Sequence, residues 1–261
     1  MEENQENIPA QECVATEGGD EIVVHIQHLK KSFGTKEVLK DINMELKKGE
    51  NIVVLGRSGQ GKSVAIKCIS GLLLQDEGSC CVFGQEVKEL SETALKEMRA
   101  KVGFLFQSAA LYDSMTVGEN LAFPLTRVLK MNDKEEINKL VEEMLDNVGL
   151  KDAINKLPSD LSGGMRKRIG LARTLILKPE IMLYDEPTTG LDPITSKEIS
   201  ELVLDMQKKY KTSSIIITHD MACARITADR IMIMNDGTFI AEGSYDELAR
   251  SDDQIVRGFF K

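Results

Sequence analysis

The first hydrophobic positions of the chain follow the pattern of strands. Residues 22–29 (IVVHIQHL) and 38–46 (VLKDINMEL) place aliphatic residues at period-two spacing, which predicts two neighbouring strands. Residues 51–56 (NIVVLG) are apolar almost throughout, as expected for a strand buried on both faces of a sheet. The chain therefore begins with an expected antiparallel β region and then enters a buried strand.

Helical spacing appears next and dominates the middle of the chain. Residues 62–73 (KSVAIKCISGLL) predict a helix that ends at Gly71 or at the turn 76–78. From about 108 to 178 most of the pattern is helical. Within it the segment 133–150 has apolar residues at i, i+3 and i+4 spacing, namely Ile137, Leu140, Val141, Met144 and Leu145.

Strand-like runs return in the last third of the chain. EIMLYDEP (180–187) and SSIIITHD (213–220) predict buried strands, and RIMIMNDGTFIAEG (230–243) predicts a hairpin turning at 235–237. The expected fold is α/β, with an N-terminal antiparallel β region and a helical subdomain at about 108–178. The expected organisation is an acidic disordered tail (1–20), one domain (21–250) and a C-terminal extension (251–261).

Charge is distributed unevenly along the 261 residues. The first twenty residues contain six acidic and no basic side chains, so they carry −6 of the formal net charge of −9 and leave −3 for the rest. A body so close to neutral lacks the basic field that nucleic-acid binding requires. No run approaches the roughly 20 apolar residues of a membrane span, and no basic region followed by an apolar one opens the chain. A soluble, cytoplasmic protein is expected.

Cysteine spacing gives little indication of a metal site or a disulfide framework. The five cysteines are odd in number and show no C-x-x-C spacing. Packed or half-buried thiols are expected at Cys80 and Cys81, in keeping with a reducing compartment.

The segment GRSGQGKS (56–63) has the chemistry of a phosphate cradle. It matches G-x-x-x-x-G-K-[ST], follows a buried strand and precedes a helix. Its glycines let backbone amides approach phosphate oxygens, Lys62 can reach the β and γ phosphates, and Ser63 can bind Mg²⁺. Asp185, at the end of the later apolar run, supplies a carboxylate for the metal, and Glu186 can polarise an attacking water.

A second stretch, LSGGMRKRIGLARTL (161–175), also has the character of an anion site. Ser162, Gly163 and Gly164 predict the N-terminus of a helix, where unpaired amides and the helix dipole favour negative charge. Two phosphate sites in one domain require an explanation.

Taken in order, these motifs resemble the nucleotide-binding subunits of ATP-binding cassette (ABC) transporters over residues 21–245. The matching pieces are Phe33, the 56–63 loop, Gln107, LSGGM, IMLYDE, GLDP and ITHD. The resemblance implies a P-loop NTPase (RecA-like) core and a head-to-tail dimer. In that dimer each ATP lies between the 56–63 loop of one subunit and the signature helix of the other, which explains the two phosphate sites.

The resemblance also implies roles for individual residues, with ATP and Mg²⁺ as cofactors. Residues implied to bind the chain's own ATP are Phe33, against adenine, and Gly56, Arg57, Ser58, Gly59, Gln60, Gly61, Lys62, Ser63 and Val64. Residues implied to hold Mg²⁺ are Ser63, Gln107 and Asp185. Residues implied in catalysis are Lys62, Gln107, Glu186 as general base and His219 at the γ-phosphate. Residues implied to serve the partner's ATP are Ser162, Gly163, Gly164 and Asp192.

Met165 departs from the common signature, which has Gln at this position. A thioether cannot donate a hydrogen bond as an amide can, so any polar contact of that side chain with nucleotide is lost. With Met165, the segments 161–175, 56–73 and 104–125 resemble the Mla, or MCE-type, lipid-transport branch. That branch implies a cytoplasmic ATPase homodimer at the inner membrane, an integral permease and an MCE-type substrate-binding protein.

Three alternatives remain open from the sequence. The chain could instead energise an importer of amino acids or other small solutes, or act as a non-transport clamp on DNA, ribosomes or cofactor-assembly machinery, or be an inactive regulatory cassette. The near-neutral body disfavours the clamp, and the presence of Lys62, Asp185, Glu186 and His219 disfavours the inactive cassette. The apolar residues after Gln107 either dock a permease or simply pack the helical subdomain.

Overall fold

A computed structural model describes residue 13, residues 16–17 and residues 20–260 of the chain. Most of the acidic tail expected at 1–20 lies outside the described residues, as does the last residue of the C-terminal extension. Within the tail, β1 (Thr16–Glu17) pairs with the start of β2, so ordered structure begins before residue 21.

The strands form one sheet with an antiparallel part and a parallel part. Its order is β6-β5-β2-β3-β11-β10-β4-β9-β8-β7, and β1 pairs with β2 beside this path. The antiparallel part contains β2 (Asp20–Phe33), β3 (Lys36–Lys47), β5 (Glu77–Val82) and β6 (Gln85–Glu86). The parallel part contains β4 (Asn51–Leu55), β7 (Val102–Leu105), β8 (Ile181–Asp185), β9 (Ser213–Thr218) and β10 (Arg230–Asn235).

The predicted hairpin is confirmed. Strand β11 (Thr238–Gly243) runs antiparallel to β10 after a two-residue turn. Asp236 (φ 49°) and Gly237 (φ 77°) are both left-handed, as the twist-compatible two-residue turn requires.

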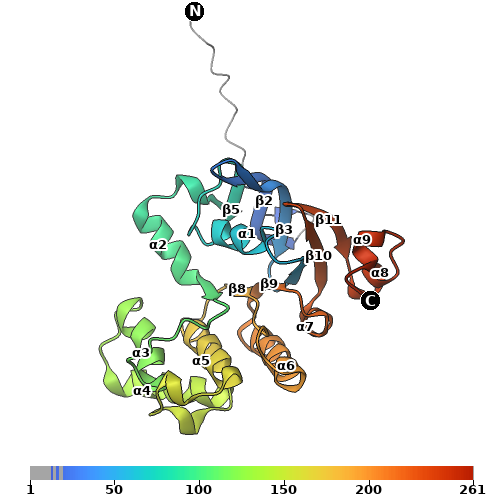
Figure 1. Cartoon of the computed structure of the whole chain (residues 1–261). Helices are drawn as coiled ribbons and strands as arrows, with labels where there is room; N and C mark the ends of the chain where they lie inside the picture. The colour runs from blue at the N-terminus through green and yellow to red at the C-terminus, as the bar shows by residue number, and fades with distance from the viewer. Residues whose placement is uncertain (1–12, 14–15, 18–19, 261) are drawn as a thin grey trace, which may run out of the picture.

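Helices occupy the connections and the helical subdomain. They are α1 (Lys62–Ile69), α2 (Glu92–Lys101), α3 (Val117–Arg127), α4 (Lys134–Asn147), α5 (Gly163–Leu175), α6 (Pro193–Tyr210), α7 (Met221–Thr227), α8 (Tyr245–Ala249) and α9 (Gln254–Arg257). Short 3₁₀ turns lie at Val87–Glu89, Lys151–Ala153 and Pro158–Asp160. Figure 1 shows α3, α4 and α5 gathered on the side of the molecule away from the strands β2, β3 and β5. Helix α1 stops just before Gly71 (φ 66°), the earlier of its two predicted ends.

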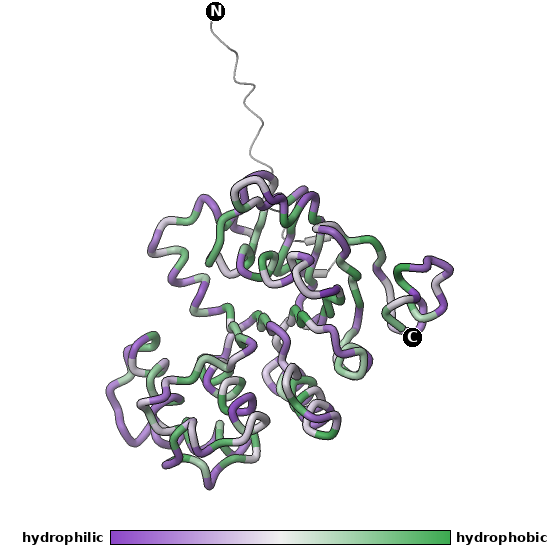
Figure 2. The backbone as a smooth tube through the Cα atoms, viewed as in Figure 1, coloured by the Kyte–Doolittle hydropathy of each residue, from purple (hydrophilic) through white to green (hydrophobic). Residues whose placement is uncertain are grey.

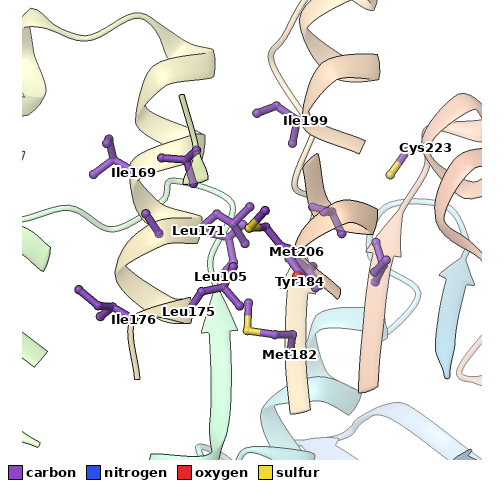
Figure 3. Close-up of a cluster of buried hydrophobic side chains, with 14 of the residues drawn as sticks. Leu105, Ile169, Leu171, Leu175, Ile176, Met182, Tyr184, Ile199, Met206 and Cys223 are labelled. Atoms are coloured by element: carbon purple, nitrogen blue, oxygen red, sulfur yellow. The ribbon is translucent and has the colours of Figure 1, made fainter. Parts of the chain in front are cut away.

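The two faces of the parallel strands contribute to two separate hydrophobic cores. Because side chains alternate along a strand, Met182 and Tyr184 of β8 point to one face, and Ile181 and Leu183 point to the other. The first face packs against α5 and α6, as Figure 3 shows, and the second packs against α1 and the antiparallel strands. Figure 2 shows the hydrophobic residues concentrated along the central strands. Hydrophobic cores therefore cover both faces of the sheet.

The expectation of free thiols is wrong for Cys81. Cys81, buried on β5, forms a disulfide with Cys13, whereas Cys80 beside it is a free buried thiol. The partners are 68 residues apart in sequence, and the fold places their Cα atoms 5.7 Å apart. Cysteine spacing carries no information about such a contact.

No helix among the described residues combines the length and the apolar character needed to cross a bilayer.

Candidate active site

The predicted site residues meet because four parallel strands end at the same edge of the sheet. Strands β4, β9, β8 and β7 are neighbours in that order. Each is followed by a predicted site segment: the 56–63 loop after β4, His219 after β9, Asp185–Glu186 at the end of β8, and Gln107 after β7. The carboxyl ends of parallel strands are the usual place for ligands in such sheets.

One cavity of about 760 Å³ lies at this edge. Its lining contains every predicted residue for the chain's own ATP except Gly56, together with three residues that the sequence analysis did not single out. The lining residues are Phe33, Lys36, Val38, Arg57, Ser58, Gly59, Gln60, Gly61, Lys62, Ser63, Val64, Gln107, Asp185, Glu186, Thr189 and His219.

The 56–63 loop is shaped by close backbone packing. Gly61 has φ 103°, and a Cβ there would lie 2.8 Å from the carbonyl oxygen of Val38. A Cβ on Gly56 would lie 2.7 Å from the carbonyl oxygen of Met234. Gly61 is also the N-cap of α1 and has no side chain to cap the helix, so the first amides of α1 face the loop. This arrangement suits an anion.

Lys62 is only 6% exposed, and its ammonium lies within the loop. Its Nζ donates to the carbonyl oxygens of Gly56 (2.7 Å) and Arg57 (3.0 Å). Burial lowers the pKa of Lys62, while the nearby carboxylates of Glu186 and Asp185 raise it. A bound phosphate would supply the countercharge that this buried cation needs.

Ser63 and Asp185 form a pair of oxygen donors suited to a divalent cation. The Ser63 hydroxyl donates to Asp185 Oδ1 at 2.8 Å, across 122 residues of sequence. Gln107 lines the same cavity and adds an amide oxygen. Hydroxyl, carboxylate and amide oxygens are the ligands that Mg²⁺ prefers, so the donor set fits this ion.

Glu186 has an unusual backbone conformation. Its φ of 52° is left-handed, which is uncommon for a residue with a side chain, and its N–H donates to the carbonyl of Ile217 (2.9 Å). Its Oε2 lies 2.8 Å from His219 Nδ1 and accepts from the Thr189 hydroxyl at 3.1 Å. The carboxylate therefore faces the cavity between a histidine and a hydroxyl.

The second segment predicted to bind an anion, at the start of α5, lies outside the cavity. Ser162 caps α5 and accepts from the Met165 N–H (3.3 Å), which confirms the predicted helix N-terminus. A Cβ on Gly164 would lie 2.6 Å from Thr195, so the start of α5 lies against the start of α6, where Asp192 is the N-cap. None of the four signature residues, Ser162, Gly163, Gly164 and Asp192, lines the cavity.

The structure also shows the surroundings of Phe33 and Met165. Phe33 is 48% exposed at the edge of the cavity, and the Lys31 ammonium lies 5.7 Å from the centre of its ring. Met165 packs its side chain against the core of the helical subdomain, so the residue that departs from the common signature is partly buried.

Several residues of the site are not predicted by the sequence patterns. Lys36, Val38 and Thr189 line the cavity, and the buried Lys167 contacts two of the site's backbone segments. The one signal available for Lys167 was a charged residue among the apolar positions of a helix.

Comparison with known proteins agrees with this geometry. Residues 39–189 match the family model for ABC transporters. A dimeric ATP-binding cassette solved in a post-hydrolysis state with ADP and Pi has a TM-score of 0.77 and 31% identity, covering 85% of this chain and 98% of that one.

Curated relatives extend the similarity along most of the chain. The probable ribonucleotide transport ATP-binding protein mkl of Mycobacterium leprae is 39% identical over 238 residues, which is 91% of this chain and 68% of the relative. Trigalactosyldiacylglycerol 3, a chloroplastic protein of Arabidopsis thaliana, is 37% identical over 260 residues, covering 93% and 74%. The methionine import ATP-binding protein MetN of Clostridioides difficile is 38% identical over 226 residues, covering 87% and 70%.

The family match, the motif order and the shared cassette fold lead to one conclusion. This chain belongs to the ABC transporter family, whose cassettes bind ATP with Mg²⁺ and couple its hydrolysis to transport.

Proposed function

We propose that this chain is the ATPase subunit of a lipid transporter of the Mla, or MCE, type. It works as a homodimer on the cytoplasmic face of the inner membrane and drives a separate permease that moves phospholipid or related hydrophobic molecules. The observation that carries the cargo assignment is the resemblance of segments 56–73, 104–125 and 161–175 to that branch. The similarity to a plant protein named after a galactolipid supports it.

To the residues in the cavity we assign the roles that the family resemblance implies. The 56–63 loop and Lys62 hold the phosphates, and Phe33 stacks on adenine. Ser63, Asp185 and Gln107 would hold Mg²⁺, which would supply positive charge beside the phosphoryl oxygens. Glu186 takes the proton of the attacking water, and His219, hydrogen-bonded to Glu186, contacts the γ-phosphate.

The separation of the two anion sites supports the composite dimer. Because Ser162, Gly163, Gly164 and Asp192 lie outside the cavity, they are free to close the site of a second subunit. Each chain then contributes two half-sites, and ATP joins the subunits.

A second cavity, of about 420 Å³, supports a permease contact beside Gln107. Tyr112, Phe123 and Pro124 line it, and the two aromatic rings are 4.9 Å apart. By contrast, Leu121 and Leu125, which lie on α3 with Phe123 and Pro124, are fully buried in the core. The apolar residues after Gln107 therefore divide between packing and an open groove, into which we place a helix of the permease.

The proposed base is tested by Glu186→Gln. We expect ATP affinity within about twofold of wild type and hydrolysis reduced by about 100-fold or more, because a neutral amide cannot accept the proton. Phosphate release measures the rate, and fluorescent-nucleotide titration measures affinity. The matched control is Glu180→Gln, which alters a surface carboxylate paired with Lys101. Normal hydrolysis by Glu186→Gln would show that Glu186 is not the base.

The cargo is tested by capturing the tagged Glu186→Gln protein from detergent-solubilised native membranes and analysing proteins and lipids together. The proposal expects a multi-span permease, an MCE-type protein and enriched phospholipid. The similarity to MetN favours small-solute import as the second candidate. A permease that co-purifies with a solute-binding protein, without enriched lipid, would replace the lipid assignment and leave the ATPase role intact.

A further inference from the structure

Lys167 is a buried cation that joins two parts of the site to the signature helix. It lies on α5, five residues after Ser162, and is 6% exposed. Its Nζ donates to the carbonyl oxygen of Gln107 at 2.6 Å and to that of Glu186 at 3.1 Å. Each acceptor is a backbone group of a residue proposed for the reaction. A buried ammonium is costly unless it is hydrogen-bonded, so these two contacts hold the segments firmly.

The charge of Lys167 also matches its surroundings. Burial lowers the pKa of Lys167, and the carboxylates of Glu186 and Asp185 act in the opposite direction. The two carboxylates therefore offset part of the cost of burying this ammonium.

Arg173 makes the same kind of contact further along α5. Its guanidinium donates to the carbonyl oxygens of Ala110 (2.7 Å) and Ala109 (3.2 Å) and lies 5.6 Å from the centre of the Tyr112 ring. Both alanines are left-handed, with φ of 61° and 46°, a backbone that persists only where surrounding contacts impose it. Lys167 and Arg173 thus hold the two ends of the segment 107–110 on α5.

Glu186 links these contacts to the proposed reaction, because its carbonyl accepts from Lys167 and its carboxylate is the proposed base. Its left-handed backbone is held by its own N–H, which donates to Ile217, and by its carbonyl, which accepts from Lys167 at 3.1 Å and from the Thr189 N–H at 3.4 Å. Loss of the Lys167 contact would remove the shorter of the two hydrogen bonds to the Glu186 carbonyl. Rotation of that peptide would move the carboxylate away from His219 and Thr189.

We propose that Lys167 is a positioning residue that aligns the Glu186 carboxylate with the position of the signature helix. The inference rests on the proposed role of Glu186 as general base. Lys167 contacts both Gln107 and Glu186. A displacement of α5 would therefore move a proposed Mg²⁺ ligand and the proposed base of the same subunit together.

The test compares Lys167→Met, which keeps length but removes the donors, with Lys167→Arg, which keeps a cation able to donate to both carbonyls. In the full-length protein we expect Lys167→Met to lower kcat roughly 10- to 100-fold with KM for ATP within about twofold, because misplacing a reacting group costs rate more than binding. Lys167→Arg should recover most of the loss. The matched control is Arg168→Met, which removes a cation of the same helix that pairs with Glu198.

The double variant Lys167→Met/Glu186→Gln separates positioning from general damage. If Lys167 acts through Glu186, the double variant hydrolyses ATP no more slowly than Glu186→Gln alone, because the two changes remove one contribution. Fully additive losses would overturn the inference, as would a Lys167→Met protein with wild-type kcat or a Lys167→Arg protein no better than Lys167→Met.

Two further controls keep the outcomes distinct. Should Lys167→Met fold poorly in thermal denaturation, Lys167→Gln, which retains one donor group, is measured against the same criteria. If Glu186→Gln itself hydrolysed ATP normally, the proposed base would fail. If Glu186→Gln is inactive and Lys167→Met is normal, only the positioning role fails.

Discussion

Buried polar side chains differ in how well the fold satisfies them. The ammonium groups of Lys62 and Lys167 each have two carbonyl acceptors. The hydroxyl of Tyr184, by contrast, has no hydrogen-bond partner among the described residues. Tyr184 is fully buried between α5 and α6, in the cluster shown in Figure 3, and burial raises its pKa. An unpaired buried hydroxyl destabilises the native state.

Tyr184→Phe is therefore expected to stabilise the protein. Removing the unpaired hydroxyl should raise the free energy of unfolding by about 1 kcal/mol, measured by urea denaturation. The control is Tyr210→Phe, since the Tyr210 hydroxyl accepts from Asn147 at 2.9 Å and its loss should destabilise. If Tyr184→Phe destabilised as much as Tyr210→Phe, the Tyr184 hydroxyl would have to be paired.

Asp192 gives a pH-dependent contribution at the start of α6. Hydrogen bonds from the Thr195 side chain and from the backbone of Thr195 and Ile194 lower the pKa of Asp192. Folding lowers the pKa of this carboxyl below its ordinary value of about 3.8. The ionised carboxylate therefore stabilises the protein above about pH 3.8. This contribution is lost as the pH falls through the lower pKa of the folded state.

Asp192→Asn keeps the capping acceptor and removes the charge. We expect it to be less stable than wild type at pH 7 and to approach wild type as the pH is lowered below 4. Urea midpoints across this range measure the difference, with the exposed Asp252→Asn as control. A gap that stayed constant with pH would contradict the assignment.

At the scale of elements, helix α5 contacts several separate parts of the site. It begins at the signature residues, carries Lys167 and Arg173, and lies very close to the segment 107–110 at Gly170. A Cβ on Gly170 would lie 2.8 Å from the Cβ of Ala109 and 3.0 Å from Leu105. A glycine inside a helix is unfavourable by itself, so the close approach explains its presence.

Gly170→Ala is expected to destabilise despite the better helix propensity of alanine. Overpacking should lower the free energy of unfolding by about 1–3 kcal/mol, measured by denaturant. Gly170→Ala/Ala109→Gly should recover much of the loss, because glycine removes the opposing Cβ and tolerates the left-handed backbone at 109. If the single and double variants were equally destabilised, the contact between the Cβ atoms of residues 170 and 109 would not be the cause of the loss.

At the scale of the whole molecule, the proposed composite site requires two chains. The cavity contains the 56–63 loop but none of the signature residues. A mixture of two differently disabled subunits can therefore regenerate one complete site, whereas neither subunit can do so alone.

We expect Lys62→Ala and Ser162→Asp each to be inactive alone. Aspartate still caps α5, but it repels the phosphate of the partner's ATP. An equal mixture should recover up to about a quarter of wild-type hydrolysis, because in a symmetric dimer half of the pairs are mixed and each has one intact site. Phosphate release against mixing ratio measures this. No recovery at any ratio would argue against a composite site.

Local patterns were enough to predict most of the fold and the main part of the site. The buried strands, the hairpin turn and the 56–63 loop follow from short stretches in which spacing and backbone requirements are explicit. Predicting that Asp185, Gln107 and His219 lie beside that loop required one further step, because carboxyl ends of parallel strands share an edge.

Contacts between distant segments could not be predicted in this way. The Cys13–Cys81 disulfide, the Lys167 contacts to Gln107 and Glu186, and the division of Tyr112 and Leu121 between groove and core depend on side chains from different elements. The sequence by itself determined the α/β class, the phosphate-binding chemistry and the family, because these are encoded in local spacing. Only the tertiary structure decided which buried groups meet, because packing brings together residues that no local pattern relates.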